Sequence, residues 1–235
     1  NSFADDPSPI RELQRHFATS VVIGCSTAGE VFGAEVADES LAVAITQFEH
    51  TTLRLAVGEI GSAEHTGAVA RDLGRQLAGP ELSGVLVLSD GLTVNGTELA
   101  RGLTAELPEG TVITGGLAGD GSRFQRTWVI AGTQDPRQQV VAAVGFYGTQ
   151  VRIGHGSRGG WDPFGPERMV TRSVGNVLYE LDGKPALALY KEYLGDRASG
   201  LPATALLFPL AIRATADDER SLVRTVLAVD ESKQS

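Results

Sequence analysis

Cysteine is nearly absent from this sequence: Cys25 is the only one among 235 residues. A single cysteine excludes an internal disulfide framework and is typical of proteins in a reducing compartment. Long hydrophobic runs are also missing. The longest, residues 140–147, is far shorter than the about 18 residues of a membrane-spanning helix. No basic segment followed by an apolar run opens the chain, so no secretion signal is visible. We therefore expect a cytoplasmic protein without membrane insertion.

Basic residues are scarce as well. Lys and Arg total 20 against 29 Asp and Glu, which gives a formal net charge of -9. Proteins that depend on phosphate contacts normally have the opposite balance, so we expect no nucleic-acid partner. Apolar residues make up 42% of the chain, which is too much for a disordered protein. The composition is that of an ordinary globular chain, large enough to bury a core.

Glycine is abundant, with 29 residues, and it separates short apolar runs of strand length. These runs predict strands at residues 21–24, 41–48, 52–57, 84–89, 111–114, 127–131 and 140–147, and later at 169–173, 177–181, 205–213 and 222–229. The second and third of these strands are separated by three residues, which predicts a hairpin. Leucine and valine at four-residue spacing predict helices at residues 62–78 and 96–107, and Pro185 suits the first turn of a helix at 185–194.

The order of these elements mixes crossover and hairpin connections. It predicts an α/β fold with mixed parallel and antiparallel sheets in two modules, for which a layered sandwich is one arrangement. The composition changes after Gly148, where a stretch rich in Gly and Pro begins. We expect one module at residues 1–149, with its start missing, and a second, partial module at residues 150–235.

Four glycine-rich loops follow the short strands, at residues 24–30, 89–96, 115–121 and 154–161. Ligands of α/β sheets collect beyond the carboxyl ends of strands, and glycine lets the backbone approach a ligand closely. The first three loops are therefore predicted to converge on one cavity. The alternative is that they are tight turns in a glycine-rich protein. None has a phosphate-binding signature.

Three aspartates, Asp90, Asp120 and Asp162, lie in loops beside glycine or proline. Such residues often accept hydrogen bonds within their own turn. Together with Arg123, they would also suit a zwitterionic ligand, since arginine pairs with a carboxylate and aspartate with an ammonium group. Asp90 is the preferred polar anchor because it directly follows an apolar strand. Asn95 is predicted to cap the helix that follows, with Glu98 completing a capping box.

Cys25 could act as a nucleophile, but no basic neighbour in the sequence would lower its pKa, so a small apolar role at a strand end is favoured. The four histidines show no metal-ligand spacing, and no metal site is predicted. His155 is the one weak candidate for a haem ligand, against the alternative of an ordinary loop histidine.

Several segments together resemble the FIST domain, a sensory domain of bacteria and eukaryotes. They are VVIGCSTAGEVFG at residues 21–33, SDGLTVNGTELARGL at 89–103, TVITGGLAGDGSRFQRTWV at 111–129, and PERMVTRSVGNVLYELDGKPALALYKEYLG at 166–195. The last is similar to the opening of the C-terminal FIST module, and the resemblance covers nearly the whole chain.

The resemblance implies an intracellular, bacterial signalling protein that binds a small ligand, such as an amino acid or a related metabolite. It also implies a downstream partner such as a histidine kinase or a cyclic-dinucleotide enzyme. The candidate ligand-binding residues are Cys25, Ser26, Thr27, Asp90, Asn95, Gly116, Asp120 and Arg123. Alternatives are a haem-based nitric oxide sensor, a hydrolase or transferase that uses Cys25, and a scaffold that pairs with a partner protein.

Overall fold

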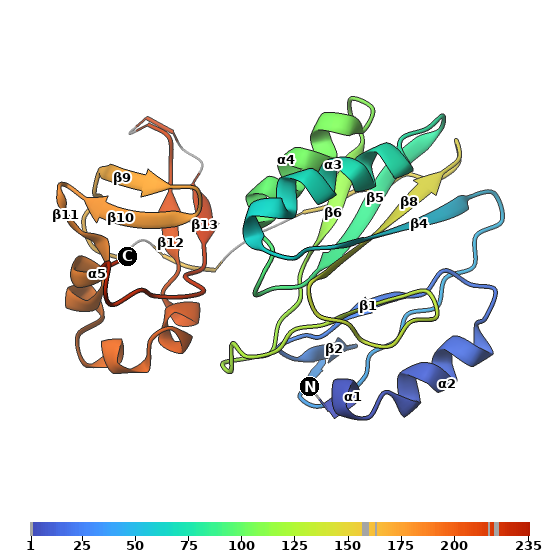
Figure 1. Ribbon diagram of the computed structural model, residues 1–235, viewed down its shortest axis with the longest axis horizontal. Helices are drawn as coiled ribbons and strands as arrows, with labels where there is room; N and C mark the ends of the chain where they lie inside the picture. The colour runs from blue at the N-terminus through green and yellow to red at the C-terminus, as the bar shows by residue number, and fades with distance from the viewer. Residues whose placement is uncertain (1, 157–159, 163, 216, 219–220) are drawn as a thin grey trace. The chain divides into compact units, whose positions relative to one another are not determined.

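The structure, a computed structural model, describes residues 2–156, 160–162, 164–215, 217–218 and 221–235 (Figure 1). The chain divides into two units, Asn1–Gly156 and Ser157–Ser235, each of which is described by itself. The fold is α/β with mixed parallel and antiparallel sheets, as predicted. Among the described residues, no helix has both the length and the apolar character that crossing a membrane requires.

A four-stranded sheet forms the centre of the first unit, in the order β4-β8-β5-β6. Its strands are β4 (Thr52–Glu59), β5 (Leu82–Ser89), β6 (Val112–Leu117) and β8 (Val140–Tyr147). β5 and β6 run parallel, whereas β8 pairs antiparallel with both β4 and β5. All four strands were predicted from their apolar runs. The parallel pair brings the carboxyl ends of β5 and β6 to the same edge of the sheet.

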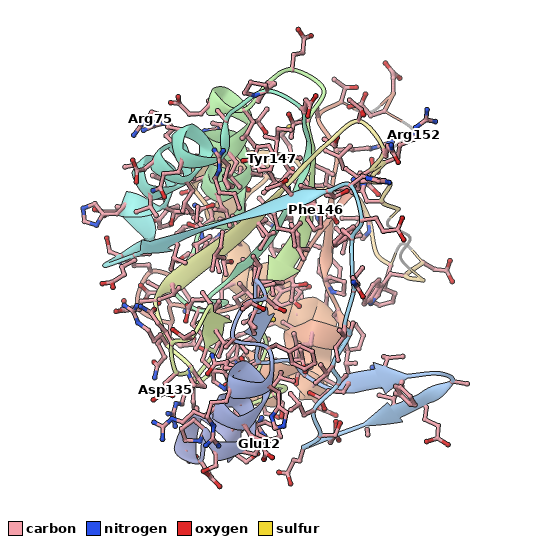
Figure 2. The ribbon with its side chains drawn as sticks, turned by 90° about the vertical axis from the view of Figure 1, so that its right-hand side faces the viewer. Glu12, Arg75, Asp135, Phe146, Tyr147 and Arg152 are labelled. Carbon is pink, nitrogen blue, oxygen red and sulfur yellow. The ribbon has the colours of Figure 1, made fainter. Side chains whose placement is uncertain are left out.

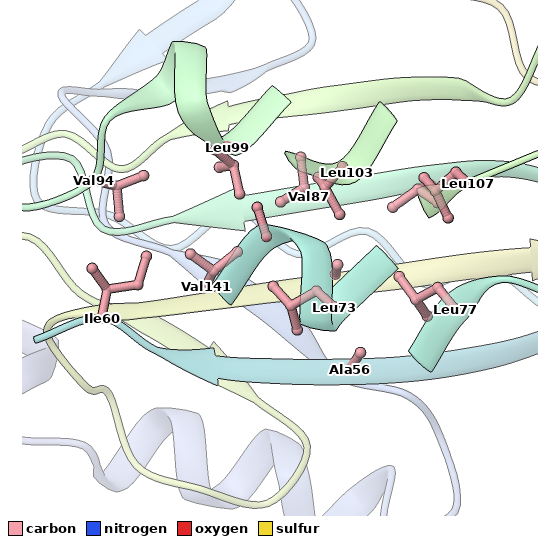
Figure 3. Close-up of a cluster of buried hydrophobic side chains, with 13 residues drawn as sticks. Ala56, Ile60, Leu73, Leu77, Val87, Val94, Leu99, Leu103, Leu107 and Val141 are labelled. Atoms are coloured by element: carbon pink, nitrogen blue, oxygen red, sulfur yellow. The ribbon is translucent and has the colours of Figure 1, made fainter. Parts of the chain in front are cut away.

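Two helices, α3 (Thr66–Leu77, after the 3-10 turn η1 at Ala63–His65) and α4 (Gly96–Glu106), cover one face of this sheet (Figure 1). The four-residue spacing predicted both of them. Leu73, Leu77 and Leu103 are fully buried and belong to the same cluster as Val85 and Val141 of the sheet (Figure 3). Burial of such side chains contributes roughly 1.5–3 kcal/mol each, so this cluster is the main core of the unit.

A second layer lies against the other face of the sheet. β1 (Ile23–Cys25) pairs antiparallel with β7 (Val129–Ala131), and the helices α1 (Ser2–Asp5) and α2 (Ser8–His16) accompany this pair. Ile10 of α2 is buried in a cluster with Trp128 and Ile130. The amide of Gln14 donates to the carbonyl oxygens of Gly132 and Gln134, which holds α2 to the turn after β7.

The predicted strand and hairpin at residues 41–48 are wrong. These residues are exposed and form no strand, while a short hairpin forms just before them, from β2 (Glu30–Phe32) and β3 (Glu35–Ala37). β4 pairs instead with β8, in a continuous register from Thr52↔Tyr147 to Glu59↔Val140. Alternating apolar residues favour an extended backbone, but they do not decide which partner a neighbouring strand takes.

The second unit contains a three-stranded antiparallel sheet of β9 (Val170–Val174), β10 (Val177–Leu181) and β11 (Lys184–Pro185). The helix α5 (Ala186–Leu194) follows, then the 3-10 segments η2 (Gly195–Gly200) and η3 (Ala203–Leu207), and a hairpin of β12 (Leu210–Ile212) and β13 (Leu222–Arg224). The helix and the first two strands agree with the sequence. The strands predicted at 205–213 and 222–229 are too long, because the first begins within η3 and the second ends at Arg224.

Candidate functional site

Three of the glycine-rich loops meet at the carboxyl ends of β5 and β6. The backbone N–H of Ala118 donates to the carbonyl oxygen of Ser89 at 2.7 Å, and that of Gly119 donates to the carbonyl oxygen of Ser26 at 2.9 Å. The structure thus brings together the loops at residues 24–30, 90–95 and 115–120. Their convergence on a cavity remains a prediction.

Two shallow cavities lie elsewhere in the first unit. One, of about 460 Å³, lies at the amino-terminal ends of β5 and β6, between the 108–111 turn and residues 151–153. The other, of about 420 Å³, lies between β4 and the turn after β7. Neither is lined by a residue of the three loops. The cavities therefore give no support to a site at the loops, which must be argued from the loops themselves.

The close approach of the loops depends on glycine. A Cβ on Gly91 would lie 1.9 Å from the carbonyl oxygen of Ala118, which leaves no room for any side chain. The N–H of Gly91 donates to the hydroxyl of Thr127 at 3.0 Å, in the buried interior of the loop cluster. Gly91 is therefore a packing glycine that allows two loops to touch.

Asp90 points into this cluster and is only 2% exposed. One carboxylate oxygen accepts the N–H groups of Leu92 at 3.0 Å and Thr93 at 2.7 Å. The other accepts the hydroxyl of Thr127 at 2.9 Å and the N–H of Gln139 at 3.2 Å. Four hydrogen bonds occupy the acceptor sites of a carboxylate. This geometry supports the alternative in which Asp90 accepts hydrogen bonds from its own loop and braces it, over its predicted role as a polar anchor.

Asp120 holds the third loop in the same way. It is 3% exposed, and its carboxylate accepts the N–H groups of Phe124, Gln125 and Arg126 at 3.1, 2.8 and 2.9 Å. The neighbouring Arg123 side chain is exposed. Hydrogen bonds from several backbone N–H groups stabilise a charged carboxylate, so the Asp120 side chain is favoured in this position within its own loop.

Within the first unit, the carboxylates of Asp90 and Asp120 are therefore used inside their own loops, and neither is free to meet Arg123 around a ligand. Asp90 and Asp120 each bind their own loop, and Asp162 is an exposed residue of the second unit. Arg123 is the one member of the set in the first unit whose side chain is exposed.

The first loop is fixed by Ser26 and Glu30. Ser26 is buried, and its backbone and hydroxyl exchange hydrogen bonds with the backbone of Trp128 at 2.9 and 3.1 Å. Thr27 donates its hydroxyl to Glu30 at 2.5 Å, and Ser40 donates both its N–H and its hydroxyl to the same carboxylate. These donors, the Thr27 hydroxyl first, lower the pKa of Glu30.

Asn95 is the predicted cap of α4. Its side-chain oxygen accepts the N–H groups of Thr97 and Glu98 at 3.1 and 3.2 Å. The predicted capping box is wrong: Glu98 pairs with Arg101, while the N–H of Asn95 donates to the hydroxyl of Thr66. The hydroxyl of Thr66 in α3 thus accepts the N–H that the glutamate was predicted to accept, which the local sequence could not indicate.

The exposed part of the loop cluster differs from its buried part. Thr27, Gly116 and Arg123 are exposed, and a Cβ on Gly116 would meet nothing within 4 Å. The surface that these loops present to solvent thus includes a hydroxyl, an uncovered stretch of backbone and a guanidinium group, together with the apolar side chains of Leu92 and Leu117.

The comparison with protein families tests the resemblance to the FIST domain that the sequence motifs suggested. The FIST N domain family matches residues 1–184. The chain belongs to the FIST family. No curated protein and no solved structure matches it. The FIST match continues beyond the division of the chain at Gly156 and ends at Lys184, so it spans part of both units.

Cys25 of this FIST domain is partly buried and packs against the cluster of Val129, Ala131, Val140 and Ala142. Burial raises the pKa of its thiol. Because the thiolate is the nucleophilic form, this environment disfavours the hydrolase or transferase alternative.

We expect iodoacetamide to label Cys25 slowly in the native FIST domain, with a rate that rises only above the pH at which a free cysteine ionises, about 8.5. The same shift makes the unfolded thiol ionise first, so its contribution to stability is present below that pH and is lost as pH rises through the folded pKa. Labelling rates between pH 7 and 10, with and without urea, measure this. Equal rates in both conditions would contradict it.

His155, the haem-ligand candidate, is exposed after β8, and part of its loop, residues 157–159, lies outside the described residues. In the described part of the chain, no group of three or more His, Cys, Asp or Glu side chains has a metal-binding arrangement. None of the residues that the structure describes around His155 favours haem over an ordinary loop histidine.

Two residues central to the loop cluster were not singled out from the sequence. Thr127 is 1% exposed and links Gly91 to Asp90. Trp128 is buried and pairs with Ser26. Both lie at the end of the motif at residues 111–129. The available signal was Thr127, a polar residue at the start of an apolar strand. Their hydrogen-bond partners lie more than 35 residues away in the sequence, so local patterns could not indicate these contacts.

Proposed function

We propose that this FIST domain is a cytoplasmic sensor that binds a small ligand, an amino acid or a related metabolite, on the solvent-facing side of the three joined loops. It passes the binding signal to a signalling protein such as a histidine kinase or a cyclic-dinucleotide enzyme. FIST domains are sensory and ligand-binding domains, which supports the general role. The backbone junction of the loops at Ser26, Ser89 and Ala118 is the observation that carries this location.

The residues divide between two roles in this proposal. Asp90 and Asp120 hold the loops from inside, which keeps the outer backbone in one conformation. Arg123 is the contact for a ligand carboxylate, with which a guanidinium makes paired hydrogen bonds. The open backbone at Gly116 and the hydroxyl of Thr27 are polar contacts of the same surface. A preorganised site of this kind loses little entropy on binding.

The test is thermal unfolding of the purified domain in the presence of each free amino acid in turn. A ligand that binds only the folded state raises the unfolding midpoint as its concentration increases. We expect at least one amino acid to do so, and Arg123→Ala to abolish the effect without changing the midpoint of the ligand-free protein. Arg71→Ala is the matched control, because Arg71 is an exposed arginine of α3 outside the loops.

Binding that persists in Arg123→Ala would contradict the location of the site. A complete absence of stabilisation by any amino acid would contradict the ligand class. A Soret band in the absorption spectrum of protein purified from its host would instead identify a haem sensor.

A further inference from the structure

One exposed segment of the first unit is rich in both apolar and acidic residues. It comprises residues 30–49, which we name the acidic arm: the β2–β3 hairpin followed by the extended residues 41–48. The arm contains five carboxylates and no Lys or Arg, and these carboxylates are Glu30, Glu35, Asp38, Glu39 and Glu49. Among the described residues, Glu35, Asp38 and Glu39 form no ion pair with a basic side chain.

The backbone of the arm has few partners. The β2–β3 pair forms a two-stranded sheet of its own, and a two-stranded sheet is marginally stable without a third strand. Within the described chain, the N–H and C=O groups of residues 41–48 make no backbone hydrogen bond. Eight consecutive residues thus offer the hydrogen-bonding groups of an unpaired strand.

The side chains of the arm have the pattern of a strand with one apolar face. Leu41, Val43 and Ile45 alternate along residues 41–48 and are 41%, 45% and 68% exposed. On the hairpin, Phe32 is 84% and Val36 is 75% exposed. Figure 2 shows this hairpin as a pale blue pair of strands that projects outward. Large apolar side chains that are exposed along one segment indicate an interaction surface.

The arm is fixed at both ends. At its start, the carboxylate of Glu30 binds both Thr27 and Ser40, which ties the base of the hairpin to residue 40. At its end, the ring of Phe48 meets that of Phe146 in β8 edge to face, with 5.9 Å between the ring centres. The residues between these two anchors are therefore held as an exposed span.

We propose that residues 41–48 bind an extended, basic segment of a partner protein by strand addition. The unpaired backbone groups would form the ladder, and Leu41, Val43 and Ile45 would cover apolar side chains of the added strand. The surrounding carboxylates select a segment that carries Lys or Arg, and they disfavour a second copy, because two arms side by side would place like charges opposite one another. This inference does not depend on the identity of the sensed ligand.

The test uses three ten-residue peptides: alternating Val and Arg, alternating Val and Glu, and alternating Pro and Arg. The first has the proposed chemistry, the second reverses the charge, and the third keeps the charge but cannot pair its backbone. We expect the Val–Arg peptide to bind at least tenfold more tightly than the other two by fluorescence anisotropy. Hydrogen exchange should slow at alternating amides of residues 41–48 when it binds.

Two proline variants of the domain test whether the peptide binds at residues 41–48. Val43→Pro and Ala44→Pro each remove one N–H of the exposed span, and successive N–H groups point to opposite edges. At least one of them should weaken Val–Arg binding tenfold or more, with the unfolding midpoint unchanged in both.

Three results would overturn the proposal. Equal binding of the Val–Arg and Pro–Arg peptides would show general attraction to an acidic protein. Slow exchange at residues 41–48 in the peptide-free protein would show that the span is already paired within the chain. A dimer in sedimentation velocity that either proline variant abolishes would assign the arm to a second copy.

Discussion

The Gly115→Ala variant should lose about 4 kcal/mol of stability, a large share of the roughly 5–15 kcal/mol by which native domains are stable. Gly115 lies in β6 with φ +135°, a backbone conformation that residues other than glycine rarely adopt. A Cβ there would lie 1.8 Å from the carbonyl oxygen of Val87, its partner in β5. That oxygen belongs to the backbone of the parallel ladder, so it cannot move aside without breaking the pairing. Urea denaturation followed by circular dichroism measures the loss.

Gly116→Ala is the matched control at the next position. Gly116 has no positive φ, and a Cβ on it would meet nothing within 4 Å. We expect its free energy of unfolding to lie within about 0.5 kcal/mol of that of the wild type. Equal stability of the two variants would show that β6 does not approach β5 as the structure has it.

The central sheet and its helices could be predicted because their signals are local. The leucines of α3 and α4 repeat at helical spacing, and β8 is a continuous apolar run. Such patterns fix the type of an element, and the parallel β5–β6 pair then places their following loops at one edge. The meeting of the loops at residues 90–95 and 115–120 follows from this step alone.

The failed hairpin prediction and the hydrogen bonds of Asp90 both involve contacts between distant parts of the chain. Residues 41–48 have the alternation of a strand, but β4 takes its partner from β8, about 90 positions later in the sequence. Asp90 was predicted to anchor a ligand because it follows a strand, but a carboxylate at a strand end can equally brace its own loop. Its direction is decided by Thr127 and Gln139, which no pattern around Asp90 reveals.

Replacing Asp90 by alanine should destabilise the ligand-free protein by roughly 3 kcal/mol. The change leaves the hydroxyl of Thr127 without its acceptor in a buried setting. The N–H groups of Leu92, Thr93 and Gln139 lose their acceptor too, but these bonds are partly buried, and water can replace the carboxylate there. The free energy of unfolding from urea denaturation, without any added ligand, measures the loss.

Asp90→Asn is the control that separates the two carboxylate oxygens. Its amide oxygen can still accept the N–H groups of Leu92 and Thr93, whereas its amide nitrogen would present N–H donors to the N–H of Gln139. We therefore expect Asp90→Asn to lose about half as much stability as Asp90→Ala. If both variants were as stable as the wild type but lost ligand-induced stabilisation, Asp90 would be the ligand anchor after all. A loss of stability in the ligand-free protein, graded from asparagine to alanine, would establish that the carboxylate braces the loops on which the proposed site is built.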